Sequence, residues 1–208
     1  MNNIKCLKTC DIKAALFDFG GVLAEEGFMA GLMAIAEKNA MNKQEILNLG
    51  FETVYETGFV TGRVREDAFW AKIRKKTGIQ GKTEDLTEEI LSRFVIREWM
   101  LKLVSDLKTE GIAVGILSDQ SHWLDEIDKR HNFFHHFDRV FNSYYIGITK
   151  KDPSIFNLVI KQLGISPEDV LFIDDHLPHI KRAQTRGLKT ILYTNKKDFF
   201  KQLQKFCK

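Results

Sequence analysis

The feature that most constrains the fold is a repeated alternation of short apolar runs with amphipathic helical segments. The apolar runs have the length of buried strands and occupy residues 14–17, 112–117, 170–173 and 190–193, and a further short strand is expected at 139–142. Segments with helical spacing of apolar residues follow or precede them at 98–110, 121–130, 153–163, 178–186 and 196–206. Strands that alternate with helices form a parallel sheet with helices on both faces. We therefore expect an α/β fold with a doubly wound, Rossmann-like parallel sheet.

One long segment, residues 24–97, interrupts this alternation. It holds no convincing strand and shows helical spacing of apolar residues at 28–36, 43–55, 65–76 and 83–94. A chain of 208 residues is long enough for a core with a small insert. We therefore expect an α/β core from residues 1–23 and 98–208, with 24–97 as an inserted helical cap.

Composition excludes several classes of protein. The formal net charge is only +3, with both signs interleaved, so there is no electrostatic case for a nucleic-acid or membrane partner. Three cysteines, Cys6, Cys10 and Cys207, lie near the ends of the chain, and an odd number so placed suggests no disulfide framework. The polar first residues do not resemble a secretion signal, which makes the cytoplasm the expected location.

Polar and acidic side chains follow three of the predicted strands. They are Asp18, the pair Ser118 and Asp119, and the pair Asp174 and Asp175. The carboxyl ends of parallel strands share one edge of a sheet, so these side chains should meet in one crevice. Crowded carboxylates repel one another, and a divalent cation relieves the repulsion. Hard oxygen ligands favour Mg²⁺.

Two further features accompany these acids. Gly20 and Gly21 directly follow Asp18 and allow a sharp turn and a close approach to a ligand. Lys150 precedes a helix that begins at Asp152–Pro153, so it can reach the same edge and neutralise a phosphate or the acids. Taken singly, an Asp after a strand can simply cap a turn, and a lysine pair in a loop is more often solvated surface.

Four segments in this order resemble the motifs of the haloacid dehalogenase-like (HAD) hydrolase superfamily. Residues 17–23, Phe-Asp-Phe-Gly-Gly-Val-Leu, resemble its first motif, and residues 117–119, Leu-Ser-Asp, its second. Residues 150–156 resemble the third, and residues 172–175, Phe-Ile-Asp-Asp, the fourth. Each motif is weak alone, but four in register are specific. The helical insert resembles the small cap of this superfamily.

The resemblance implies a catalytic role for three residues. Asp18 would be the nucleophile and form an aspartyl-phosphate intermediate. Ser118 would hydrogen-bond the phosphoryl group, and Lys150 would neutralise charge on the nucleophile and the phosphate. The resemblance also implies a Mg²⁺ cofactor, bound by Asp18, the backbone carbonyl of Gly20 and Asp175. Asp174 would be a further metal ligand or an acid that supports the ligands.

The sequence departs from the family pattern at Gly20. Most HAD phosphatases carry an Asp two residues after the nucleophile, which protonates the leaving group. Glycine cannot do so, and the loss of general acid catalysis typically costs ~10²–10⁴-fold in rate. Glu25, Glu26 and His176 are candidates to replace it. His179 stands where the fourth motif often has Asn, and we interpret both histidines as surface residues.

These observations leave several functions open. The leading hypothesis is a Mg²⁺-dependent phosphatase that acts on a small phosphorylated metabolite, with specificity set by the cap. The cap residues Glu25, Glu26, Phe28, Arg63 and Arg65 are candidate substrate contacts. A 2-haloacid dehalogenase needs no leaving-group acid, but it also needs no metal. A phosphonatase requires a lysine in its cap that forms a Schiff base. A binding or regulatory protein with weak or no catalysis is the alternative that is not an enzyme.

Overall fold

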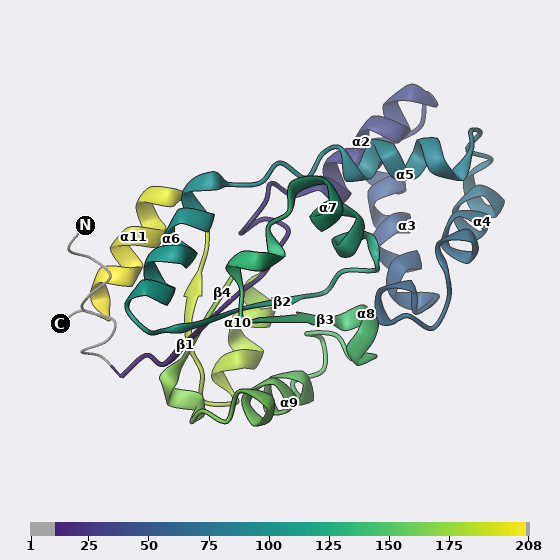
Figure 1. Cartoon of the computed structure of the whole chain (residues 1–208). Coiled ribbons are helices and arrows are strands. Elements are labelled where there is room, and N and C mark those ends of the chain that lie inside the picture. Colours follow the sequence, from purple (N-terminus) through teal and green to yellow (C-terminus); the bar gives the residue numbers. More distant parts are fainter. Residues whose placement is uncertain (1–10, 207–208) are drawn as a thin grey trace.

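Five parallel strands form a single sheet in the order β3-β2-β1-β4-β5 (Figure 1). The structure is a computed structural model and describes residues 11–206. The strands are β1 (Ala14–Phe17), β2 (Ala113–Ser118), β3 (Arg139–Asn142), β4 (Val170–Asp174) and β5 (Lys189–Leu192). The first strand lies in the centre, between β2 and β4. The predicted doubly wound parallel sheet is confirmed.

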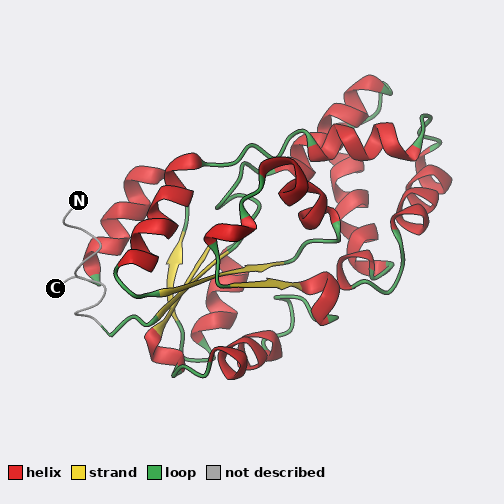
Figure 2. Ribbon diagram, in the orientation of Figure 1, coloured by secondary structure: helices red, strands yellow, loops and turns green. Residues whose placement is uncertain are grey.

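Helices cover both faces of the sheet because alternate strand residues point to opposite sides. On β1, Ala15 and Phe17 belong to one apolar cluster, and Ala14 and Leu16 belong to another. The first cluster includes side chains of α6, α7 and α11, and the second includes those of α9 and α10. Figure 2 shows the strands between these two layers. These helices are α6 (Glu98–Thr109), α7 (Trp123–His131), α9 (Ser154–Leu163), α10 (Leu177–Gln184) and α11 (Lys196–Lys205).

Four helices stand between β1 and α6, where the sequence predicts a helical insert. They are α2 (Gly27–Lys38), α3 (Lys43–Glu56), α4 (Glu66–Thr77) and α5 (Thr83–Leu91), with a short 3-10 turn at η1 (Phe59–Thr61). Figure 1 shows them grouped at one end of the molecule, beyond β2 and β3. The Asn42 side chain caps the start of α3 by accepting bonds from the amides of Gln44 and Glu45.

An aromatic cluster joins these helices to the sheet. Trp123, from α7, has its ring 5.1 Å from that of Phe59, 5.9 Å from that of Phe69 and 6.4 Å from that of Trp70. All four side chains are buried and belong to the same apolar cluster as Phe17 of the central strand. The helical insert therefore packs against the core through one continuous apolar interior.

Arg97 links the two ends of the insert by hydrogen bonds. Its Nη1 donates to the carbonyl oxygens of Gly21, Val22 and Ala24 at 2.5–2.9 Å, and its other nitrogens bind the Glu25 carboxylate. Five donors in a fixed fork suit arginine to this task. These bonds hold the loop after β1, which carries Gly20 and Gly21 next to Asp18.

Most predicted elements lie within a few residues of their observed bounds, with two differences. The helix predicted over 83–94 ends at Leu91, and Phe94 turns into the core instead. The short helix α8 (Ser143–Ile146) was not predicted, because four residues are too few to show a helical period. The cysteines discussed above lie outside the described residues. Within residues 11–206, no helix combines the length and the apolar character that crossing a bilayer requires.

Candidate active site

The acids predicted to converge do so beside the central strand. Asp18 directly follows β1, and Asp174 is the last residue of the adjacent strand β4. The Asp18 amide donates to the Ile173 carbonyl oxygen at 2.9 Å, which continues the pairing of the two strands. In the order β3-β2-β1-β4-β5, the chain reverses its direction of winding between β1 and β4. Ligands of open α/β sheets bind at such a reversal.

Lys150 lies at the centre of the acidic cluster. Its Nζ is 2.6 Å from Asp18 Oδ2 and 2.6 Å from Asp174 Oδ2, and its side chain is only 1% exposed. Ser118 Oγ donates to Asp18 Oδ1 at 2.8 Å, and the Phe19 amide donates to the same oxygen at 2.7 Å. The structure therefore brings together Asp18, Ser118 and Lys150, the three residues predicted as catalytic.

Both oxygens of Asp174 are bound by protein donors. The His176 amide donates to Oδ1 at 2.7 Å, and Oδ2 contacts Lys150 and, at 3.2 Å, His179 Nδ1. The interpretation of His179 as a surface residue is wrong, because its side chain is buried. It lies on the inner face of α10 together with Ile180. Asp174 thus orients Lys150 and His179 from beneath the site.

Burial and mutual charge shift the titration of these groups. Burial raises the pKa of Asp18 well above its usual range, Lys150 opposes this shift, and Asp174 and Asp175 reinforce it. Burial alone would also raise the pKa of Asp174, but Lys150 and His179 hold the pKa of that carboxyl below its usual range. Desolvation by the surrounding protein atoms and the charge of Asp174 raise the pKa of Asp175, although part of its side chain stays accessible to solvent. One ammonium group faces three carboxyl groups, so the site favours additional positive charge.

Asp175 lies against the glycine turn that follows Asp18. A Cβ atom added to Gly21 would be 2.0 Å from Asp175 Oδ2, and Gly21 also has a φ of +76°. Only glycine fits both the close approach and this backbone conformation. Unlike Asp174, Asp175 is exposed and borders the cavity together with Asp18 and Gly20.

The oxygen donors at this edge fit Mg²⁺. Asp18, Asp174 and His179 have ligand atoms within 4.8 Å of one another. However, the Lys150 ammonium already contacts both of those carboxylates, which leaves no place for a cation between them. Asp18, Gly20 and the exposed Asp175 border the cavity together, and hard oxygen donors with room for water and phosphate are what Mg²⁺ prefers.

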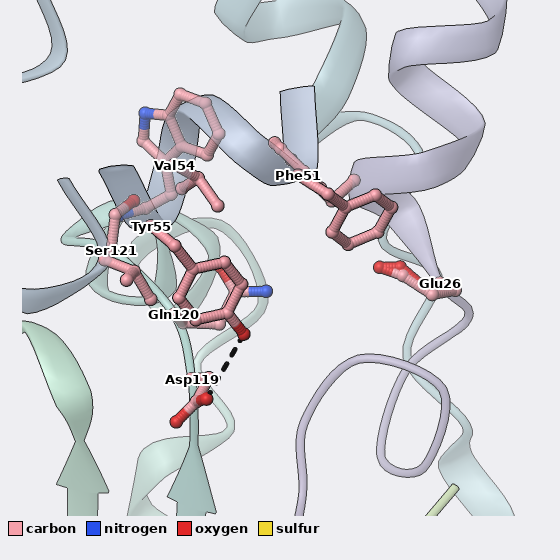
Figure 3. A pocket seen from close by; sticks show the side chains of 10 residues that line it. Glu26, Phe51, Val54, Tyr55, Asp119, Gln120 and Ser121 are labelled. Atoms are coloured by element: carbon pink, nitrogen blue, oxygen red, sulfur yellow. Dashed lines mark hydrogen bonds between the residues drawn. The ribbon is translucent and has the colours of Figure 1, made fainter. Parts of the chain in front are cut away.

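Asp119, the acid beside Ser118, links the loops around the site. Its Oδ1 accepts a hydrogen bond from the Lys150 amide at 2.8 Å, and its Oδ2 accepts one from the Tyr55 hydroxyl at 3.3 Å (Figure 3). Lys151 Nζ lies 3.2 Å from the centre of the Tyr55 ring. These contacts link helix α3 to the loop that carries Lys150 and Lys151, and no local sequence pattern indicates this role of Tyr55.

A cavity of ≈ 760 Å³ opens above the acidic cluster and is large enough for a small metabolite. Its floor contains the predicted site residues Asp18, Gly20, Ser118, Lys150 and Asp175, and its walls come from α2, α3, the loop after β2 and the start of α10. The wall residues are Glu26, Met29, Phe51, Glu52, Tyr55, Glu56, Asp119, Gln120, Lys151, His176 and His179. A recess of ≈ 70 Å³ shares several of these residues and extends between Phe28, Val54, Val60 and Trp123.

The residues proposed as substrate contacts separate into two groups. Glu26 and Phe28 line the cavity or its recess. Glu25 instead pairs with Arg97, and Arg65 borders a different pocket; Arg63 lines neither the cavity nor the recess. Burial, reinforced by the charge of Asp175, raises the pKa of Glu26 to about 7. Figure 3 shows the Glu26 carboxyl directed into the pocket, below Phe51.

A family model agrees with the motifs. The model for haloacid dehalogenase-like hydrolases matches residues 12–187, which includes all four motifs and the helical insert. The match extends over most of the chain, so the strand ends that form the site and the helices above it come from one family pattern.

The curated relatives described next match at low identity. Bifunctional epoxide hydrolase 2 of Mus musculus is 26% identical over 93% of this chain, but the match covers only 38% of that protein. The chain therefore spans about two fifths of the length of that relative. Sesquiterpene phosphatase astK of Aspergillus oryzae is 27% identical, and the match covers 85% of this chain and 87% of that protein.

Solved structures share the fold. A HAD family enzyme, bt-2542 of Bacteroides thetaiotaomicron, superposes with a TM-score of 0.73 and 25% identity, over 89% of this chain and 94% of that one. Another structure of bt-2542, at 24% identity and a TM-score of 0.69, is a complex with magnesium and inorganic phosphate.

Proposed function

The chain belongs to the haloacid dehalogenase-like hydrolases, and from this premise we propose that it is a Mg²⁺-dependent phosphatase that acts on a small phosphorylated metabolite. The observation that carries the proposal is the environment of Asp18. One carboxylate oxygen accepts bonds from Ser118 and the Phe19 amide, and the other contacts Lys150. A carboxylate held in this way at the floor of a cavity is suited to attack a phosphorus atom.

The reaction would proceed in two displacements at phosphorus. In the first, an Asp18 carboxylate oxygen attacks, the bond between phosphorus and the ester oxygen breaks, and an aspartyl-phosphate forms. In the second, water attacks phosphorus and the bond to Asp18 breaks, which releases inorganic phosphate. Ser118 would hold a phosphoryl oxygen, and Lys150 would neutralise charge as it develops.

Asp18, the Gly20 carbonyl and Asp175 would hold Mg²⁺, and Asp174 would support the site through Lys150 and His179. When bound, the metal supplies further neutralisation of phosphate charge. The bt-2542 complex with magnesium and phosphate and the phosphatase name of the fungal relative support this proposal. Residues 24–97 would act as a cap that sets specificity, over a core from 1–23 and 98–208, because they supply most of the cavity wall.

The test is phosphate release from a panel of phosphate monoesters with Mg²⁺. Wild type should release phosphate, Asp18→Asn should release none above background, and Asp106→Asn, at an exposed position on α6, should match wild type. A wild-type protein inactive toward the whole panel would contradict the proposal. Chloride release from 2-chloropropionate without metal would indicate a dehalogenase instead, and inactivity in both assays with a co-purifying partner would indicate a binding protein.

A further inference from the structure

The position that lacks its acid has a buried carboxyl group beside it. A Cβ atom added to Gly20 would lie 3.5 Å from Glu26 Oε1 and 3.6 Å from Phe94 Cε1. Glu26 Oε2 is buried and has no hydrogen-bond partner among residues 11–206. An unpaired buried polar atom is costly, so a carboxyl oxygen of this kind indicates a partner that arrives from outside the chain.

Two local contacts bring Glu26 to this place. Ala24 forms a bridge with Gly20, so the chain folds back over the turn after β1. Glu26 then stands directly before α2, and Gly27 allows the Phe94 ring to pack closely, since a Cβ there would be 2.4 Å from that ring. At this place the Glu26 Oε2 atom is shielded from water, although the residue borders the cavity. Its placement follows from the local fold, not from a flexible surface position.

We propose that Glu26 is a catalytic residue that performs the proton transfers for which Gly20 has no side chain. It borders the same cavity as Asp18 and reaches that cavity from the insert instead of from the strand end. This inference rests on the proposed phosphatase function. The carboxyl group would have moved from the residue two positions after the nucleophile to the residue eight positions after it.

The proton balance is complete with this one residue. As Asp18 attacks phosphorus and the ester bond breaks, the departing oxygen takes the proton of the Glu26 carboxyl group and leaves as an alcohol. Glu26, now a carboxylate, takes a proton from the water that attacks the aspartyl-phosphate. The bond to Asp18 then breaks, phosphate leaves, and Glu26 is protonated again.

The other candidates for this role are placed less well. The Glu25 carboxylate is bound by Arg97 and is not part of the cavity lining. His176 borders the cavity but is exposed, and its ring packs on that of His179 with 4.4 Å between centres. Asp119 already accepts bonds from the Lys150 amide and from Tyr55. Glu26 alone among these four combines burial, an unpaired oxygen and contact with the space above Gly20.

The experiment compares two substrates that differ in the acidity of the alcohol they release. The 4-nitrophenolate of 4-nitrophenyl phosphate leaves without a proton, whereas the alcohol of 2-phenylethyl phosphate requires one. Alcohol release is measured in a single turnover, which isolates the first displacement. Glu26→Gln should slow the release of 2-phenylethanol by roughly 10²–10⁴-fold and affect 4-nitrophenol far less. Glu37→Gln, at an exposed position on helix α2, which Glu26 precedes, is the matched control.

The second part of the experiment tests whether an acid at residue 20 can replace Glu26. The double variant Gly20→Asp/Glu26→Ala returns a carboxyl group to the usual position, where a Cβ meets only ordinary contacts. It should release 2-phenylethanol at least about tenfold faster than Glu26→Ala alone. Equal losses for both substrates, or no loss for either, would overturn the role of Glu26 and leave the phosphatase function intact. If wild type hydrolysed neither substrate nor any other monoester, the proposed function itself would fail.

Discussion

Lys150→Met is the perturbation that best tests the electrostatic account of the site. The substitution keeps an unbranched side chain of similar length and removes the ammonium group that contacts Asp18 and Asp174, each at 2.6 Å. At an effective dielectric constant of about 20, a pair at this distance attracts by roughly 6 kcal/mol. The cost of burying the ammonium offsets much of this gain. Removing one partner of such a buried pair typically lowers the free energy of unfolding by about 3–5 kcal/mol.

Urea unfolding with a chelator present measures this difference without interference from metal. Lys151→Met is the control for stability, because that lysine lies on the Tyr55 ring and makes no buried ion pair in the described chain; its loss should cost about 1 kcal/mol or less. The double variant Lys150→Met/Asp174→Asn should recover part of the loss, since it removes one unpaired carboxylate. A loss below about 1 kcal/mol for Lys150→Met would refute the account, because the lysine would then not be the main countercharge.

The sign of the pH dependence adds a second check. The pKa of Asp174 is lower in the folded protein than in the unfolded chain, so its contribution to stability is present above the ordinary carboxyl pKa. That contribution disappears as the pH falls through the folded value. The difference between wild type and Lys150→Met should therefore narrow in acid. A difference that widened in acid would contradict the pairing.

Three further predictions concern the glycine turn, the metal and Glu26. Gly21→Ala should displace Asp175 and weaken Mg²⁺ binding measured by calorimetry, whereas Gly164→Ala, with a φ of +66° and open space around it, should lose stability without losing metal affinity. Mg²⁺ at about 100 times its dissociation constant should raise the free energy of unfolding by about 2.7 kcal/mol in wild type but not in Asp175→Asn. Because the pKa of Glu26 is raised to about 7, its protonated form stabilises the fold at low pH and this contribution is lost above about 7. With chelator present, the free energy of unfolding of Glu26→Gln should therefore rise by roughly 2–3 kcal/mol relative to that of wild type between about pH 5 and about pH 9. A difference between the two proteins that did not change with pH would contradict the raised pKa.

The sequence predicted the fold because its signals are local and repeated. Most strands are short apolar runs, and glycine or proline bounds three of the predicted helices, at 98–110, 153–163 and 178–186. Parallel pairing then places Asp18, Ser118 and Asp174 at one edge without further information. Lys150 was predicted only through the resemblance of residues 150–156 to the third motif, because a lysine pair in a loop is by itself more often solvated surface.

The remaining parts of the site depend on packing that no local pattern encodes. The sequence favours a surface position for both His176 and His179, yet α10 turns His179 inward onto Asp174. Tyr55 reaches Asp119 only because α3 packs over the loop after β2, across 64 residues of sequence. In the sequence, Glu25, Glu26 and His176 are equivalent candidates for the missing acid. Only the bridge between Ala24 and Gly20 shows that Glu26 lies beside residue 20.

The sequence does not distinguish the roles of Gly20 and Gly21, but the structure requires glycine only at residue 21. At Gly21, the positive φ and the Asp175 carboxylate exclude any side chain. At Gly20, the φ lies outside the left-handed region, and a Cβ would have its nearest neighbours at 3.5 and 3.6 Å, an ordinary contact distance. Backbone geometry therefore does not explain the absence of a side chain at residue 20. The space that an acid there would need is bounded by the Glu26 carboxyl group, so two acids at these positions would compete for one place beside the nucleophile.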